Sequence, residues 1–99
     1  MGMFTWFDAK SAQEFGEQLA NALIERTPLE EMKSEKSLSK KHEAMLNKLN
    51  QMVAEFKKEN ALNFYKKAKL GNKFRWVLVE KGYDQEYVDR MTNWLIIKL

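Results

Sequence analysis

His42 is the only histidine in this sequence of 99 residues, and there is no cysteine. Hydrolytic triads and zinc sites need several such side chains brought together. The carboxylate nearest in sequence, Glu43, points in another direction on a helix, because adjacent helical residues do not face each other. Glycine-rich phosphate loops and dinucleotide motifs are also absent from the sequence. We therefore expect no catalytic activity, no metal and no cofactor.

The densest mixture of cations and aromatic side chains lies between residues 57 and 76. Such mixtures can bind nucleic acid by neutralising phosphates and by stacking on bases. The candidate nucleic-acid contacts are Lys66, Lys67, Lys69, Lys73 and Arg75. On a helix, the same cations would form a solvated face while Phe74 faces the core. We prefer that interpretation, because the net charge is only +3.

The charge is unevenly distributed along the chain. Residues 1–32 carry a net charge of −4, residues 33–81 carry +8 and residues 82–99 carry −1. An acidic first helix and a basic middle attract each other within one fold. A basic surface intended for a partner would produce the same pattern, so the sequence leaves both explanations open.

Four large apolar side chains exceed what one buried stripe per helix requires. Tryptophan is enriched at the hot spots of protein interfaces, although large aromatic residues also fill the ends of small bundles. The candidate interface residues are Trp6, Trp76, Trp94 and Ile97. We expect a protein partner, and a homodimer is compatible with the same residues.

The spacing of apolar residues predicts helices over residues 9–26, 38–58, 61–81 and 85–98. Asp8 is a suitable N-cap for the first of these helices. In the second of these helices, the positions expected to face a neighbouring helix are separated alternately by four and three residues, which is a heptad register. These positions are Leu38, His42, Met45, Leu49, Met52 and Phe56. The pattern is typical of helices that pack along one another at a shallow angle.

Several boundaries have more than one interpretation. Thr27, which precedes the only proline, has the pattern of a helix start. Residues 33–37 form either a polar link or a weak helical turn. Asn60 either caps a new helix or lies within a continuous one, and Gly71 either ends a helix or permits close packing. Residues 1–7 contain three aromatic side chains, and we expect this segment to be partly ordered against the core.

The corner at Gly82, Tyr83 and Asp84 is predicted by three local signals. Glycine can adopt the left-handed conformation that ends a helix, and aspartate can cap the next one. Tyr83 and Val88 have the spacing of a hydrophobic staple across the new helix start. The chain should therefore end in a helical hairpin.

The same corner resembles the helix-turn-helix motif of bacterial repressors over about twenty residues. The turn glycine is Gly82, and the apolar positions are Leu78, Val88 and Met91. The resemblance implies that the last helix binds DNA. Two departures argue against this, since Leu78 replaces the usual small residue and the last helix begins with three carboxylates that a polyanion would repel.

Together these features predict a single all-α domain over residues 1–99, built as a small antiparallel bundle of about four helices. The predicted core is Phe15, Leu19, Leu23, Met45, Leu49, Met52, Phe56, Phe64, Phe74, Leu78, Val88, Met91 and Leu95. Apolar runs are too short to span a bilayer and no signal peptide is evident, so we expect a cytoplasmic protein of bacterial type with no membrane partner. The predicted function is a non-catalytic protein–protein interaction module. The alternative is a nucleic-acid-binding accessory protein that uses residues 57–76.

Overall fold

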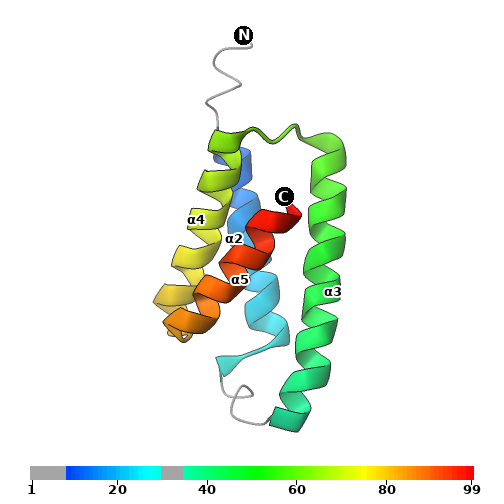
Figure 1. Ribbon diagram of the computed structural model, residues 1–99, viewed down its shortest axis with the longest axis vertical. Coiled ribbons are helices and arrows are strands. Elements are labelled where there is room, and N and C mark those ends of the chain that lie inside the picture. The colour runs from blue at the N-terminus through cyan, green and yellow to red at the C-terminus, as the bar shows by residue number, and fades with distance from the viewer. Residues whose placement is uncertain (1–8, 30–34) are drawn as a thin grey trace.

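The computed structural model describes residues 9–29 and 35–99, with side chains described for residues 9–29 and 40–99. Over these residues the chain forms four α-helices and no strand, as Figure 1 shows. The helices are α2 (Lys10–Arg26), α3 (Glu35–Glu59), α4 (Phe64–Lys81) and α5 (Gln85–Lys98). The predicted all-α helical bundle is confirmed.

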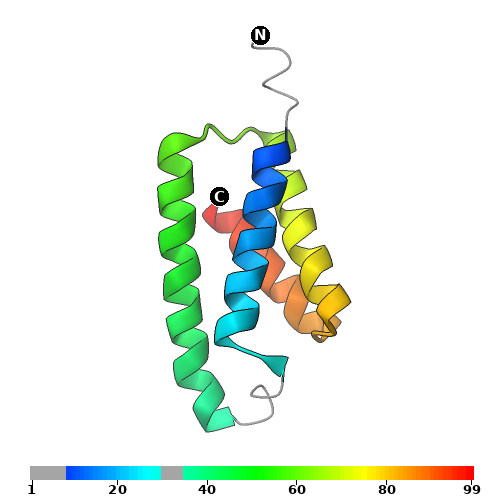
Figure 2. The same cartoon turned by 180° about the vertical axis from the view of Figure 1, so that it is seen from behind.

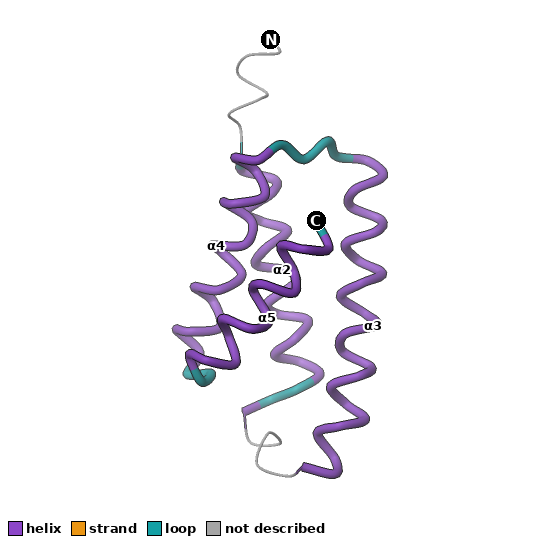
Figure 3. Tube along the Cα trace, viewed as in Figure 1, coloured by secondary structure: helices purple, strands orange, loops and turns teal. Residues whose placement is uncertain are grey.

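Consecutive helices alternate in direction, so that α2 and α4 run one way and α3 and α5 run the other (Figures 1 and 2). Helix α2 lies between α3 and α4, as the reverse view in Figure 2 shows. Helix α5 crosses α2 obliquely, on the side of α2 that faces the viewer in Figure 1, and packs mainly on α4. The loop that joins α3 to α4 passes over one end of the bundle (Figure 3).

The closest helix pairing is between α2 and α4, which run parallel. A Cβ atom added to Gly16 would lie 2.5 Å from the carbonyl oxygen of Leu70, so the absence of a side chain is what lets the backbones approach. Glu17 and Lys73 form an ion pair at 3.9 Å across the same contact, which we call the α2/α4 seam. The ion pair agrees with the expected attraction between the acidic first helix and the basic middle.

The core consists of one apolar stripe from each helix. Ten of the predicted core residues are buried: Phe15, Leu19, Leu23, Met45, Leu49, Phe74, Leu78, Val88, Met91 and Leu95. Met52 and Phe56 are half-buried and pack against this cluster. Further buried apolar side chains that the prediction did not include are Ala9, Ala12, Ala20, Ala22, Val53, Leu70, Tyr83 and Leu99.

Phe64 was predicted to be in the core, and this is wrong, because 88% of its surface is exposed. Helix α4 begins at Phe64 rather than at residue 61, with Asn63 as its N-cap. The carboxamide oxygen of Asn63 accepts a hydrogen bond from the backbone N–H of Lys66 at 2.8 Å. The buried stripe of α4 starts only at Leu70, almost two turns farther along, so Phe64 has no core beneath it.

The α4–α5 corner has the predicted geometry. Gly82 has a φ of 101°, and the backbone N–H groups of Gly82 and Tyr83 donate to the carbonyls of Val79 and Leu78, which is a Schellman motif. The Asp84 carboxylate accepts a hydrogen bond from the backbone N–H of Tyr87 at 3.2 Å. The side chains of Tyr83 and Val88, the predicted staple, are both buried.

Two open alternatives are resolved within the described residues. The helix breaks at Asn60, whose side chain donates to the carbonyl of Phe56 at 3.0 Å and so belongs to the end of α3. Gly71 lies inside α4, where an added Cβ would lie 3.1 Å from the Cγ1 of Ile96. Gly71 therefore permits close packing and does not end a helix.

The structure locates three further boundaries. Thr27 is the C-cap of α2, and its buried hydroxyl donates to the carbonyl of Leu23 at 2.8 Å, while a short 3₁₀ turn begins at Leu29. Helix α3 begins at Glu35, so of the two interpretations of residues 33–37 the helical one holds from residue 35 onward. The N-cap of α2 is Ala9, without a side-chain hydrogen bond. Asp8 and the rest of residues 1–8 lie outside the described residues.

Candidate interaction surfaces

The five predicted nucleic-acid contacts all lie on α4, but two of them are paired with carboxylates. Lys73 faces Glu17 of α2 at 3.9 Å, and the Arg75 Nε donates to Asp89 Oδ1 of α5 at 2.9 Å. Lys69 lies over the ring of Tyr65, 5.5 Å from its centroid. The two remaining lysines, Lys66 and Lys67, are half-buried near the start of the helix. The five cations therefore do not form one uninterrupted positive patch.

Helix α4 carries a second stripe, on the side opposite its buried one. Its members are separated alternately by four and three residues: Tyr65, Lys69, Asn72, Trp76 and Val79, of which Val79 is half-buried and also packs against the core. We call this stripe the outer face of α4. Trp76 lies at its centre and is 54% exposed. The spacing of this stripe is visible in the sequence, but the stripe was not predicted, because the apolar pattern of the helix indicates only its inward side.

The predicted interface residues lie in different surroundings. Trp94 is half-buried against the core, and the Lys98 ammonium lies 5.8 Å from its ring centroid. Ile97 is on α5 and 83% exposed, whereas Trp76 is on α4. Trp6 lies outside the described residues. Two of the four residues thus remain as exposed apolar groups on two different helices.

His42 takes part in a polar junction where α3 meets α5 and the end of α2. The His42 Nε2 lies 3.0 Å from the Tyr87 hydroxyl oxygen, and the two rings meet edge to face. The Tyr83 hydroxyl donates to the carbonyl of Thr27 at 2.6 Å, and the rings of Tyr83 and Tyr87 are stacked. These contacts link three helices through groups that were not predicted to meet.

Burial determines the protonation of this junction. It lowers the pKa of His42, so the folded protein favours the neutral imidazole, whose Nε2 can accept a hydrogen bond from the Tyr87 hydroxyl. It also raises the pKa of Tyr87 to about 12, so that hydroxyl keeps its proton. The contacts of the junction tie α3 to the rest of the bundle.

Over residues 9–29 and 35–99, no group of three or more His, Cys, Asp or Glu side chains is arranged to hold a metal ion.

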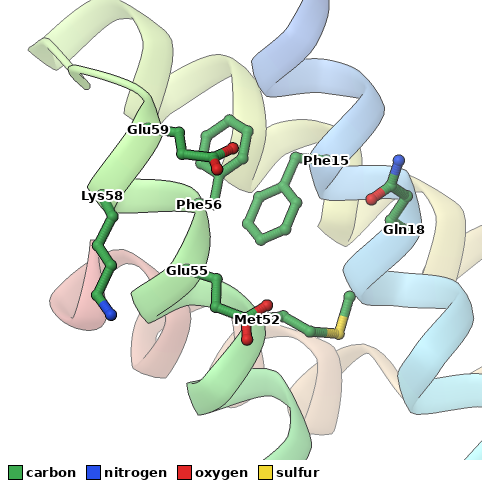
Figure 4. A pocket seen from close by; sticks show the side chains of 7 residues that line it. All are labelled: Phe15, Gln18, Met52, Glu55, Phe56, Lys58 and Glu59. Carbon is green, nitrogen blue, oxygen red and sulfur yellow. The ribbon is translucent and has the colours of Figure 1, made fainter.

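A hollow of about 410 Å³ lies between α2 and α3, and Figure 4 shows its lining. The rings of Phe15 and Phe56 stack with their centroids 4.0 Å apart and their planes 2° from parallel. Gln18, Met52, Glu55, Lys58 and Glu59 complete the lining. A second hollow of about 260 Å³ shares Phe56 and Glu59 with the first and is also lined by Ser11 and Ala12. We call the two together the α2/α3 groove.

Comparison of the chain with models of protein families, with curated proteins and with solved structures found no significant match. Among the described helices, none combines the length and the apolar character needed to cross a membrane.

Proposed function

We propose that the protein is a non-catalytic interaction module that binds an acidic, amphipathic helix of another protein along the outer face of α4. The observation that carries this proposal is Trp76, which is 54% exposed in the middle of a helical stripe with heptad spacing. Tryptophan is among the residues that contribute most to binding energy in protein interfaces. A stripe of this spacing matches the way one helix packs along another.

The charge of α4 argues for an acidic partner and against self-association through this face. Helix α4 carries six basic residues and one acidic residue, Glu80. Two copies placed face to face would bring like charges together, which costs free energy at an interface. A partner helix with carboxylates beside its apolar stripe would instead pair with Lys69 and its neighbours.

Nucleic acid is the alternative ligand of the same helix, through the cations of residues 57–76. Lys66, Lys67 and Lys69 support it, since none of them forms an ion pair among those found in the described part of the chain. The carboxylates of Glu17 and Asp89 oppose it, because they stand beside Lys73 and Arg75, where phosphates would have to approach. The protein partner is therefore preferred.

Binding of designed peptides tests the proposal. The probes are two helical peptides with the same leucine stripe, one flanked by glutamates and one by lysines, together with labelled single-stranded DNA and RNA. We expect the acidic peptide to bind, the basic one not to, and Trp76→Ala to weaken acidic-peptide binding at least about tenfold. Ile97→Ala is the matched control, because Ile97 is also exposed but lies on another helix.

Salt dependence separates the two candidate ligands. If nucleic acid is the ligand, its affinity falls steeply between about 50 and 200 mM salt, and changing Lys66, Lys67 and Lys69 to Gln flattens that slope. Tight, lysine-dependent binding of DNA or RNA would overturn the proposed function in favour of the alternative. Equal binding of the acidic and basic peptides would also refute it.

A further inference from the structure

One side of the bundle carries apolar side chains that face solvent. Phe64, in the first turn of α4, is 88% exposed, and Ile97, in the last turn of α5, is 83% exposed. Ile96, which precedes Ile97, is 44% exposed. Isolated exposed apolar residues are common on protein surfaces, whereas several on one side indicate a contact site.

The contact between α4 and α5 places Phe64 and Ile96 on the same side of the bundle. A Cβ atom added to Gly71 would lie 3.1 Å from the Cγ1 of Ile96, so this side of α4 faces α5. Phe64 precedes Gly71 by seven residues, or two helical turns, so it projects from the same side about 10 Å farther along the axis. Helix α5 does not reach the first turn of α4 (Figure 1), which leaves Phe64 uncovered.

Ile97 projects from the exposed side of α5. It follows the buried Leu95 by two residues, which is more than half a helical turn, so the two side chains point in nearly opposite directions. Asn93, about one turn before Ile97, is exposed on the same side. We define the α4/α5 apolar face by its four exposed members, which are Phe64, Ala68, Ile96 and Ile97.

The charged side chains of the two helices around this face have one sign. Residues 64–71 and 90–99 contain five basic residues and no aspartate or glutamate. Lys67 follows Phe64 by three residues and is therefore its neighbour on the helix surface. Lys98 lies over the ring of Trp94, and the Lys57 ammonium of α3 donates to the Lys98 carbonyl at 3.1 Å. The α4/α5 apolar face is thus bordered by cations from three helices.

We propose that the α4/α5 apolar face docks the protein on an anionic lipid bilayer. Phe64 and Ile97 enter the boundary between headgroups and acyl chains, and Lys67 and Lys98 contact the lipid phosphates. Helices bind membrane surfaces in this way, by burying apolar side chains while basic ones attract anionic lipids. The expectation of no membrane partner came from apolar runs too short to span a bilayer, and docking on the surface needs no spanning segment.

Shape and charge favour a bilayer over a protein at this face. Because Phe64 and Ile97 project from the surface, a protein partner would need a matching pocket for each, whereas a bilayer accommodates projecting side chains at any spacing. A second copy of the chain would bring the same cations face to face, which costs free energy. The outer face of α4 contributes nothing to this contact, so the inference is independent of the proposed function.

Sedimentation with vesicles tests the inference. The probes are vesicles of phosphatidylcholine alone and of phosphatidylcholine mixed with anionic phosphatidylserine at about 2 to 1. We expect binding to the mixed vesicles only, and a loss of at least about tenfold in the double variant Phe64→Ala/Ile97→Ala. Both side chains are exposed, so circular dichroism should show an unchanged helix content. Trp76→Ala is the matched control and should bind as the wild type, because Trp76 is exposed on the outer face of α4.

A fluorophore reports which side of the bundle meets the lipid. The sequence has no cysteine, so Asn93→Cys gives a single attachment site one turn from Ile97. Asn21→Cys is the control, since Asn21 is exposed on α2, which lies on the other side of the bundle (Figure 2). Lipids with brominated acyl chains should quench the fluorophore at residue 93 and leave the one at residue 21 unchanged.

Three outcomes would overturn the inference. One is no binding to the mixed vesicles, and another is equal binding by the wild type and the double variant. The third is loss of acidic-peptide binding in the double variant while its vesicle binding persists, because the face would then dock a protein. Failure of the acidic peptide to bind at all would refute the proposed function and leave the vesicle result standing.

Discussion

The two sides of α2 are packed by different means. On the side of α4, the backbone itself forms the contact, because Gly16 lets the carbonyl of Leu70 approach closely. On the side of α3, two stacked phenyl rings hold the helices apart and hollows of about 410 and 260 Å³ remain beside them. A contact through backbone tolerates no added atom, whereas one through side-chain tips leaves room that another segment can fill.

Helix α3 is joined to α5 by a few contacts near the two ends of α3. His42 contacts Tyr87 near one end, and the Lys57 ammonium donates to the carbonyl of Lys98 at 3.1 Å near the other. Helix α4 contacts α2 and α5 more extensively than α3 contacts any other helix. Helix α3 is therefore the helix whose position depends most on individual side chains.

The largest effect is expected from Gly16→Ala at the α2/α4 seam. The new methyl group would lie 2.5 Å from the Leu70 carbonyl oxygen, and neither backbone can move without separating the helices. The free energy of unfolding should fall by about 3 kcal/mol, the upper range for overpacking. Chemical denaturation measures it.

Gly71→Ala is the matched control for Gly16→Ala. Its new methyl group would meet side-chain atoms only, the Cγ1 and Cδ1 of Ile96 at 3.1 and 3.2 Å, which can shift by a few tenths of an ångström, and alanine is the better helix former. We expect stability to change by less than about 1 kcal/mol. Equal losses in the two variants would contradict the distinction between backbone and side-chain contacts.

The next largest effect is expected from Phe56→Ala in the α2/α3 groove. Loss of a half-buried ring that stacks on Phe15 should cost about 2 kcal/mol, less than for a fully buried phenylalanine. Hydrogen exchange should become faster in α3 while α4 keeps its protection. A uniform increase over all four helices would show that α3 is not held separately.

A change that touches neither the α2/α4 seam nor the α2/α3 groove gives a baseline for the loss of stability. Asp84→Ala removes the carboxylate that accepts from the Tyr87 N–H at the start of α5, and it should cost about 1 kcal/mol in thermal or chemical unfolding. Asp84→Asn retains an accepting oxygen and should lose less. A cost for Asp84→Ala as large as that of Gly16→Ala would mean that the corner, rather than the α2/α4 seam, dominates stability.

The smallest expected effect is a dependence of stability on pH through His42. Burial lowers the His42 pKa below its ordinary value of 6.5 in the folded state, so the unfolded chain binds the proton more readily. This contribution to stability is present above pH 6.5 and is lost as the pH falls through the folded-state pKa. Unfolding free energies measured from pH 7 to 5 should decline less steeply for His42→Gln than for the wild type, and parallel curves would contradict this role.

Much of the fold was predictable because its signals are local. The α4–α5 corner depends on the conformational freedom of Gly82, the capping oxygen of Asp84 and the spacing of Tyr83 and Val88, all within a few residues. The apolar period of α2 and α3 likewise predicted their buried sides. What local patterns could not determine was the direction from which a neighbouring helix approaches. The error at Phe64 arose in this way, since its side chain continues the apolar period of α4 ahead of Leu70, where the buried side of the helix begins.

The candidate sites were less predictable for the same reason. Trp76 was singled out from the sequence, but its place on an outward stripe follows only once Leu70, Phe74 and Leu78 are known to face inward. The partners of Lys73 and Arg75 come from α2 and α5, which are distant in the chain. His42 was expected at the edge of a helix seam, and its contact with Tyr87 depends on the inclination of α5. The spacing of residues along the chain does not indicate which distant residues become neighbours in this way.

The parallel contact between α2 and α4 has a consequence for the order of folding. All of α3 lies between these helices in the chain, so forming the Gly16–Leu70 approach requires closure of a long loop, at an entropic cost that rises with loop length. The α4–α5 hairpin has no such cost, because its corner is closed by neighbouring residues. We therefore expect the hairpin to form early and α2 to dock late. Gly16→Ala should then accelerate unfolding more than it slows refolding, which stopped-flow measurements can determine.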